Sequence, residues 1–212
     1  MAQAIEATRG FQVKEVSAAH SMDRSLIDRL ISWAGAVVAV ALIALGGAAI
    51  FGGSFALDNV RDRLEPQNIT FPPAEAMSDF DKAEGLTAFA GQKVDTGTEA
   101  EAFSRYIGGH LAEVNDGKTY SETSSESRGY AAEVGENPTA AEAATMAELD
   151  GKVQTLFRGE TLRAILLNAY GWWTVGQITF FAGIGMVIVG LILALLVAFG
   201  FRHARKAGAS TA

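Results

Sequence analysis

Two long stretches of the chain contain no charged residue, 30–57 and 164–201. The hydrocarbon core of a bilayer is about 30 Å thick, and about 20 apolar residues of helix cross it. In lipid, only a helix or a closed barrel satisfies its own backbone hydrogen bonds. Both stretches are long enough, so the sequence predicts an all-α membrane protein whose two transmembrane helices form a hairpin.

The charges beside the second stretch predict the orientation. It ends in a basic cluster made of Arg202, His203, Arg205 and Lys206. Basic residues next to a span are retained in the cytoplasm, so we expect a multi-pass protein of the cell membrane with both termini cytoplasmic. The alternative for the first stretch is a cleaved signal peptide, because Ser54-Phe55-Ala56 resembles a cleavage site. However, signal peptides have apolar regions of only about 7–15 residues.

The predicted organisation has five parts. The second stretch would be about 57 Å long as one helix, so part of it must lie outside the hydrocarbon. Aromatic residues favour membrane interfaces, and Trp33 is expected to anchor the inner end of the first span; Tyr170, Trp172 and Trp173 are expected at the outer end of the second. Whether the second helix bends at Gly171 or Gly176 or runs straight is left open. The parts are a cytoplasmic N-terminal segment (1–29), transmembrane helix 1 (30–57), a small extracytoplasmic helical domain (58–173), transmembrane helix 2 (174–201) and a cytoplasmic basic tail (202–212).

The segment between the two stretches is acidic. Residues 58–163 contain 20 acidic and 10 basic residues. This charge disfavours nucleic acid and anionic lipid headgroups as partners of the segment. The chain contains no cysteine, which excludes disulfides, thiolate metal sites and a cysteine nucleophile.

Capping residues predict where helices begin in this segment. Ser78 is expected to begin a short helix that ends at Gly85, and Thr98 with Glu101 to begin a helix over 99–115. A further helix is expected from Ala140 towards the membrane, because Thr139 and Glu142 form another capping box.

Two regions between these helices are predicted to be non-helical. Residues 64–74 contain three prolines, which favour an extended linker. Residues 116–137 are rich in Ser, Gly, Glu and Asn and are expected to form a loop.

The sequence predicts no catalytic residue, metal site, cofactor or small-molecule substrate. The chain has three histidines, and the expected topology places only His110 outside. One histidine cannot build an iron site of two histidines and a carboxylate. Ionisable residues in spans are typical of transporters, and neither stretch contains one. We therefore expect a protein that is not an enzyme.

Small residues mark one side of each predicted span, and such faces allow membrane helices to approach closely. Three readings remain open: packing of the hairpin, a face for another subunit, or no role. The candidate helix-packing residues are Ala41, Ala44, Ala48 and Gly52 in the first span and Gly183, Gly190, Ala194 and Ala198 in the second.

Two short motifs resemble a group of uncharacterised two-span membrane proteins of actinobacteria. They are the stretch from His110 through Gly117-Lys118-Thr119-Tyr120-Ser121-Glu122, and Gly159-Glu160-Thr161-Leu162-Arg163 with Leu166-Leu167-Asn168-Ala169-Tyr170. The resemblance covers most of residues 30–200 and supplies no catalytic residue. Some members are labelled aromatic-ring-opening dioxygenases, a label that the single outside histidine contradicts. If the host is actinobacterial, the resemblance implies a place for this chain among the small membrane accessory subunits of the respiratory supercomplex of that lineage.

These observations favour a non-catalytic accessory or scaffolding subunit of a larger membrane complex. Its expected partners are other membrane-protein subunits and the lipid bilayer. The alternative is an extracytoplasmic sensor or envelope-interaction protein, whose outer helices would bind a soluble partner or a cell-wall component.

Overall fold

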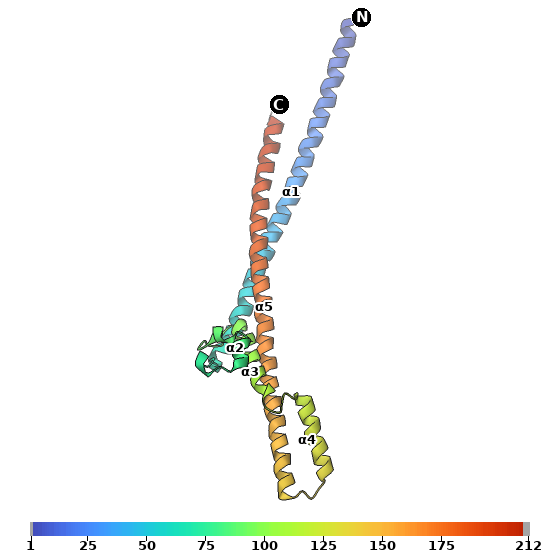
Figure 1. Ribbon diagram of the computed structural model, residues 1–212. Coiled ribbons are helices and arrows are strands. Elements are labelled where there is room, and N and C mark those ends of the chain that lie inside the picture. Colours follow the sequence, from blue (N-terminus) through green and yellow to red (C-terminus); the bar gives the residue numbers. More distant parts are fainter. Residues whose placement is uncertain (1, 210–212) are drawn as a thin grey trace. The chain divides into compact units, whose positions relative to one another are not determined.

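Helices make up most of the protein (Figure 1). A computed structural model describes the backbone of residues 2–209 and the side chains of residues 26–203 and of Arg205. Within residues 2–209 the extended structure is limited to one bridge, between Thr70 and Lys93. The mainly helical fold predicted from the sequence is confirmed. The helices are α1 (Ala2–Leu64), η1 (Glu65–Gln67), η2 (Ala74–Ala76), α2 (Asp79–Ala83), η3 (Leu86–Phe89), α3 (Gly97–Ala112), α4 (Tyr120–Val134) and α5 (Ala140–Ala209).

Helices α1 and α5 contain the two uncharged stretches. Both are long and apolar enough to cross a membrane. Helix α5 continues through Gly171 and Gly176, so neither glycine ends the helix. The prediction of two apolar helices of membrane-spanning length is therefore confirmed.

The chain divides into two compact units, and each is described by itself. The first contains the residues up to Gly52 and those from Thr179 onward, and the second is Gly53–Ile178. The division falls within α1 and α5, so residues 53–57 and 174–178 of the predicted spans belong to the second unit.

In the first unit, α1 and α5 run antiparallel. Gly35 of α1 lies against Val197 of α5, and Gly46 lies against Gly183. As the residue number rises in α1, it falls in α5, which is the arrangement of a helical hairpin.

The second unit has a hydrophobic core of its own, built from short helices around the adjoining parts of α1 and α5. Leu86 and Val94 are almost fully buried in it, as is Phe71, which is 2% exposed. The ring of Phe71 stacks on Phe89 at 5.5 Å between centroids and meets Phe103 edge-on at 5.0 Å. The buried members are Val60, Leu64, Phe71, Met77, Leu86, Val94, Ala100, Ala102, Leu166 and Trp173.

The predicted helix starts are partly confirmed. Ser78 caps α2 by accepting a hydrogen bond from the Asp81 amide at 3.1 Å. The backbone amide of Thr139 donates to the carboxylate of Glu142 at 2.7 Å at the start of α5.

Helix α3 begins earlier than predicted. Its capping box is formed by Thr96 and Glu99, whose carboxylate accepts from the Thr96 amide at 2.8 Å. Thr98 and Glu101 have the same spacing, but Thr98 already lies inside the helix. The correct cap is the first threonine after the extended residues, because there the backbone still has the φ and ψ of a cap.

The prediction of a loop over 116–137 is wrong for most of its length, because Tyr120–Val134 forms α4. Thr119 and Glu122 form a capping box at its start. The helix has no apolar stripe, since the residues it buries are Thr123 and Ser124. The segment 64–74 also contains short helical turns, η1 and the start of η2, on either side of extended residues.

Candidate interaction surfaces

The two helices of the first unit touch through their backbones. A methyl group placed on Gly183 would lie 2.7 Å from both the carbonyl oxygen of Gly46 and the amide nitrogen of Ile50. A methyl group on Gly46 would lie 2.8 Å from the carbonyl oxygen of Gly183. Because no side chain separates the helices at this point, only glycine fits at either position.

The contact continues along α5 at Gly190, where a methyl group would lie 3.1 Å from the carbonyl oxygen of Ala39. Gly183 and Gly190 are therefore both buried against α1. Of the other two candidates in α5, Ala194 is half-buried and Ala198 is exposed.

The candidates in α1 lie on another face. Ala41, Ala44, Ala48 and Gly52 are exposed, and no atom lies within 4 Å of a methyl group placed on Gly52. The prediction that these four residues form the contact face of the hairpin is corrected, because Ala39, Gly46 and Ile50 form that face instead. Their other predicted role, as a face for another subunit, stays a prediction.

A seven-residue spacing was the signal for the correct face. The buried positions of α1 recur at Ser32, Ala39, Gly46, Gly53 and Val60. A seven-residue repeat keeps one face of a helix towards its neighbour. Ala34, Ala41 and Ala48 have the same spacing. Their series continues to the large Phe55 and the charged Asp62, which do not suit a close helix contact. The series of buried positions continues instead to the core residue Val60.

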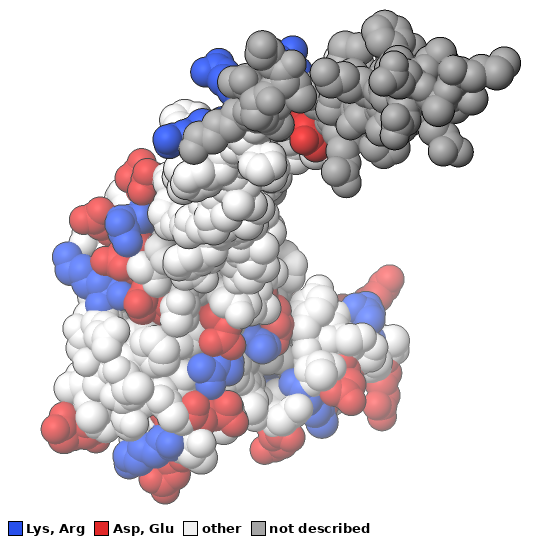
Figure 2. Space-filling model, turned by 90° about the horizontal axis from the view of Figure 1, so that it is seen from above, with Lys and Arg blue, Asp and Glu red and all other residues white. Residues whose placement is uncertain are grey.

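Large apolar side chains cover the rest of the paired helices. Figure 2 shows a white, charge-free surface over the paired helices. Such a surface is typical of contact with lipid or with other membrane helices. The side chains that are at least half exposed include Val37, Val40, Leu45 and Phe51 in α1 and Phe181, Ile188, Ile192 and Leu195 in α5.

The predicted interfacial anchors differ in exposure. Trp33, Tyr170 and Trp172 are exposed, and the ring of Trp33 meets Phe201 edge-on at 5.8 Å. Trp173 is 8% exposed and belongs to the core of the second unit. The guanidinium of Arg61 lies 5.9 Å from its ring centroid. The prediction that Trp173 is an anchor is corrected, because its ring packs inside protein.

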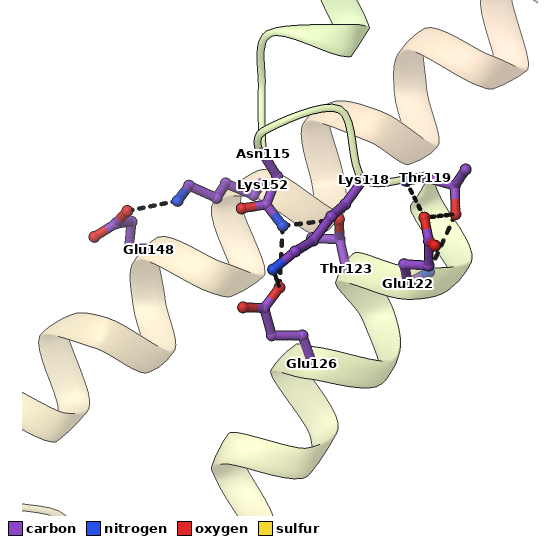
Figure 3. Close-up of polar contacts among 8 residues, drawn as sticks. All are labelled: Asn115, Lys118, Thr119, Glu122, Thr123, Glu126, Glu148 and Lys152. Atoms are coloured by element: carbon purple, nitrogen blue, oxygen red, sulfur yellow. Dashed lines mark hydrogen bonds and ion pairs between the residues drawn. The ribbon is translucent and has the colours of Figure 1, made fainter.

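A polar cluster joins the α3–α4 connection to α4 (Figure 3). The side-chain amide of Asn115 donates to the Thr123 hydroxyl at 3.0 Å and to the Glu126 carboxylate at 3.1 Å. Lys118 donates to the same carboxylate at 2.9 Å. The hydrogen bond from Lys118 lowers the pKa of Glu126 most, and the hydrogen bond from Asn115 lowers it further. The cluster supplies polar contacts at the buried face of α4, where Thr123 and Ser124 lie in place of an apolar stripe.

On the adjacent turns of α5, Lys152 pairs with Glu148 at 2.8 Å. The hydrogen bond raises the pKa of Lys152 and lowers that of Glu148. Glu148 is exposed and Lys152 is half-buried at the surface of the helix, and surface pairs of this kind contribute little to stability.

A second exposed apolar face lies on α5 in the second unit. Phe157 is 53% exposed and lies 5.8 Å from the ring of Tyr120 in α4. Leu162 and Ile165 are 54% and 59% exposed. Nothing in the sequence analysis pointed to this face, because the apolar residues there do not follow one helical period.

His110 is exposed on α3, with its ring 4.4 Å from that of Tyr106. Burial, with a smaller contribution from the charge of Asp81, raises the pKa of Tyr106. Among the described side chains, no group of three histidine, aspartate or glutamate residues has the geometry of a metal site.

No protein-family model, curated protein or solved structure matches the chain. The resemblance to two-span actinobacterial membrane proteins therefore stays a prediction.

Proposed function

We propose that the protein is a non-catalytic accessory or scaffolding subunit of a larger membrane complex, with a respiratory supercomplex as one candidate. It would cross the cell membrane twice, with both termini cytoplasmic and most of the second unit outside. The glycine contacts of the paired helices support a membrane hairpin, since lipid-embedded helices associate through small residues.

The observation that carries the proposal is the apolar face of α5 beyond the end of the first span. Residues 57–61 of α1 lie beside residues 173–176 of α5, since Gly176 faces Leu57 and Arg61 lies over Trp173. Asp58 and Arg61 carry charge at this level, so the hydrocarbon must end there.

Exposed apolar side chains continue past this level. At 1.5 Å per residue, Ile165 lies about 12 Å and Leu162 about 16 Å beyond Trp173 along the helix. The headgroup layer extends only about 5–8 Å past the hydrocarbon. Lipid therefore does not cover these side chains, and a protein partner that is itself a membrane subunit would do so.

Site-specific photo-crosslinking tests the proposal. A photoreactive residue at Ile165 in native membranes should give one discrete cross-linked product containing a membrane subunit. The matched control is Gln154, which is also exposed on α5 but polar, and it should give no such product. Equal cross-linking at both sites, or a product containing only a second copy of the chain, would contradict the proposed role.

Copurification gives a second test. Mild-detergent affinity purification at the natural expression level should recover the protein with a fixed set of membrane subunits. The double variant Leu162→Ser with Ile165→Ser should lose these subunits and keep its helical content. Recovery of a lone monomer from wild-type membranes would count against the proposal.

The runner-up function is an extracytoplasmic sensor or an envelope-interaction protein. The polar and acidic α4 favours it, because this helix presents Glu122 and Glu133 to solvent and is held by polar contacts. Under this alternative, deletion of residues 118–138 would abolish function while the membrane subunits still copurified.

A further inference from the structure

A cleft opens in the first unit, between the start of the uncharged part of α1 and the end of the uncharged part of α5. Its volume is 790 Å³, within the range of about 300–1,000 Å³ typical of ligand pockets. Polar groups come from Asp28, Ser32, Arg202 and His203, and apolar walls from Ile31 and Phe199.

A glycine keeps the floor of the cleft open. A methyl group placed on Gly200 would lie 2.9 Å from the hydroxyl oxygen of Ser32. Ser32 is otherwise buried, at 6% exposure. A side chain at position 200 would therefore fill the space in front of this hydroxyl group.

The cleft contains charges of both signs. Asp28 contributes a carboxylate and Arg202 a guanidinium. Among the ion pairs between described side chains, none joins Asp28 to Arg202 or His203. A ligand with an anionic and a cationic group can contact both, whereas a simple anion would meet the repulsion of Asp28.

We propose that this cleft binds the headgroup of a phospholipid that carries both a phosphate and a primary ammonium, as in phosphatidylethanolamine. The fork of Arg202 matches two phosphate oxygens, and Ser32 donates a third hydrogen bond. Asp28 accepts hydrogen bonds from the ammonium group. Ile31 and Phe199, which are 66% and 64% exposed, contact the acyl chains.

This inference rests on the membrane location within the proposed function, but not on any protein partner. The cleft lies at the end of the paired helices, so in a membrane it would be beside the headgroups of one leaflet. The exposed apolar side chains on its rim continue into the charge-free surface of the helix pair, which is where the acyl chains of the same lipid would lie.

Native mass spectrometry of the full chain in detergent tests the inference. Phosphatidylethanolamine, phosphatidylglycerol and phosphatidylcholine with identical acyl chains are added in turn. We expect phosphatidylethanolamine to bind about tenfold more tightly than the other two, because phosphatidylglycerol lacks the ammonium and the choline group has no N–H to donate.

Three variants identify the contacts. Asp28→Asn should weaken phosphatidylethanolamine binding about tenfold and leave phosphatidylglycerol binding unchanged or stronger. Arg202→Gln should weaken binding of all three lipids. Arg205→Gln, which removes an exposed charge of the same tail outside the cleft, should change binding less than twofold. Circular dichroism of each variant controls for loss of helix.

Several results would overturn the inference. Preference for phosphatidylglycerol, or unchanged phosphatidylethanolamine binding in Asp28→Asn, would indicate an anionic-lipid site or unspecific adhesion. Soluble glycerophosphoethanolamine that binds as tightly as the lipid would exclude a role for the acyl chains. The binding assay uses the isolated chain, so its result does not depend on whether other subunits copurify. Recovery of the chain from the soluble fraction would refute the membrane location on which both this inference and the proposed function rest.

Discussion

The interior of each unit is packed in a different way. In the first, glycines bring the backbones of α1 and α5 into contact and large apolar side chains point outward. In the second, large side chains such as Phe71 and Leu86 fill an interior. Burying apolar surface stabilises a fold in water, but it gains little in lipid, where the surroundings are equally apolar. The contrast agrees with the membrane location that we propose for the paired helices.

The largest expected effect is in the second unit. Phe71→Ala removes a ring that is 2% exposed and contacts three aromatic neighbours, so it should cost about 3–5 kcal/mol. Hydrogen exchange measured by mass spectrometry should rise over residues 60–112 and stay unchanged over 30–50 and 180–198.

The matched control is Phe157→Ala in the same unit, where the ring is 53% exposed. It should cost less than about 1 kcal/mol. Increased exchange in both units after Phe71→Ala would mean that they unfold together, and the comparison would fail.

The next effect is in the first unit. Gly183→Leu forces a side chain into the backbone of α1, because even its first carbon would lie 2.7 Å from the Gly46 carbonyl oxygen. Such overpacking costs about 3 kcal/mol. The melting temperature in detergent should fall, and exchange should rise over residues 30–50.

Gly185→Leu provides the control two residues away, since no atom lies within 4 Å of a methyl group there. Leucine is the better helix former, so this variant should be neutral or stabilised by up to about 1 kcal/mol. Equal losses in both variants would show that the helices do not pair through Gly183.

A smaller effect is expected at the contact between α4 and the α3–α4 connection. Thr123→Val keeps the shape of a fully buried side chain but removes the hydroxyl that accepts from Asn115. The loss should be about 1–3 kcal/mol and should be confined to residues 113–134 in hydrogen exchange.

Thr145→Val is the control, because Thr145 is exposed and its hydroxyl donates only to its own helix, at the carbonyl of Ala141. It should change stability by less than about 0.5 kcal/mol. Protection of α4 that survives Thr123→Val would mean that contacts other than this cluster hold the helix.

The sequence predicted the strongly patterned parts of the fold. Uncharged length located the apolar parts of α1 and α5, and capping pairs located the starts of α2 and α5. Helix α4 was not predicted, because it is held mainly by polar side chains and its sequence has no apolar period. Its capping box at Thr119 and Glu122 was the available signal.

The choice of face on α1 failed for a different reason. Alanine and glycine are frequent all around this helix, so small size alone does not select one side. Glycine permits a closer approach than alanine, and the backbone contact forms where Gly46 meets Gly183. The sequence placed residues 58–173 outside the membrane, but it did not single out the exposed face of Leu162 and Ile165, because the apolar residues there do not follow one helical period.

The smallest expected effect is a pH dependence restricted to the second unit. Hydrogen bonds from Thr119 lower the pKa of Glu122, and those from Lys118 and Asn115 lower that of Glu126. A carboxyl whose pKa is lower in the folded state contributes stability that is present above its unfolded pKa. This stability is lost as the pH falls through the folded pKa. Protection of α4, corrected for the intrinsic pH dependence of exchange, should therefore decrease below about pH 5.

The double variant Glu122→Gln with Glu126→Gln isolates these two groups. At neutral pH its α4 should be less protected than in the wild type, because a neutral amide accepts weaker hydrogen bonds from Lys118 and from the helix start. Its protection should change less with pH, since the two titrating groups are absent. The uncharged parts of the first unit, residues 30–52 and 179–201, should show no change in either protein. A pH dependence of equal size in the two units would mean that the acidic side chains act on the whole chain rather than on α4.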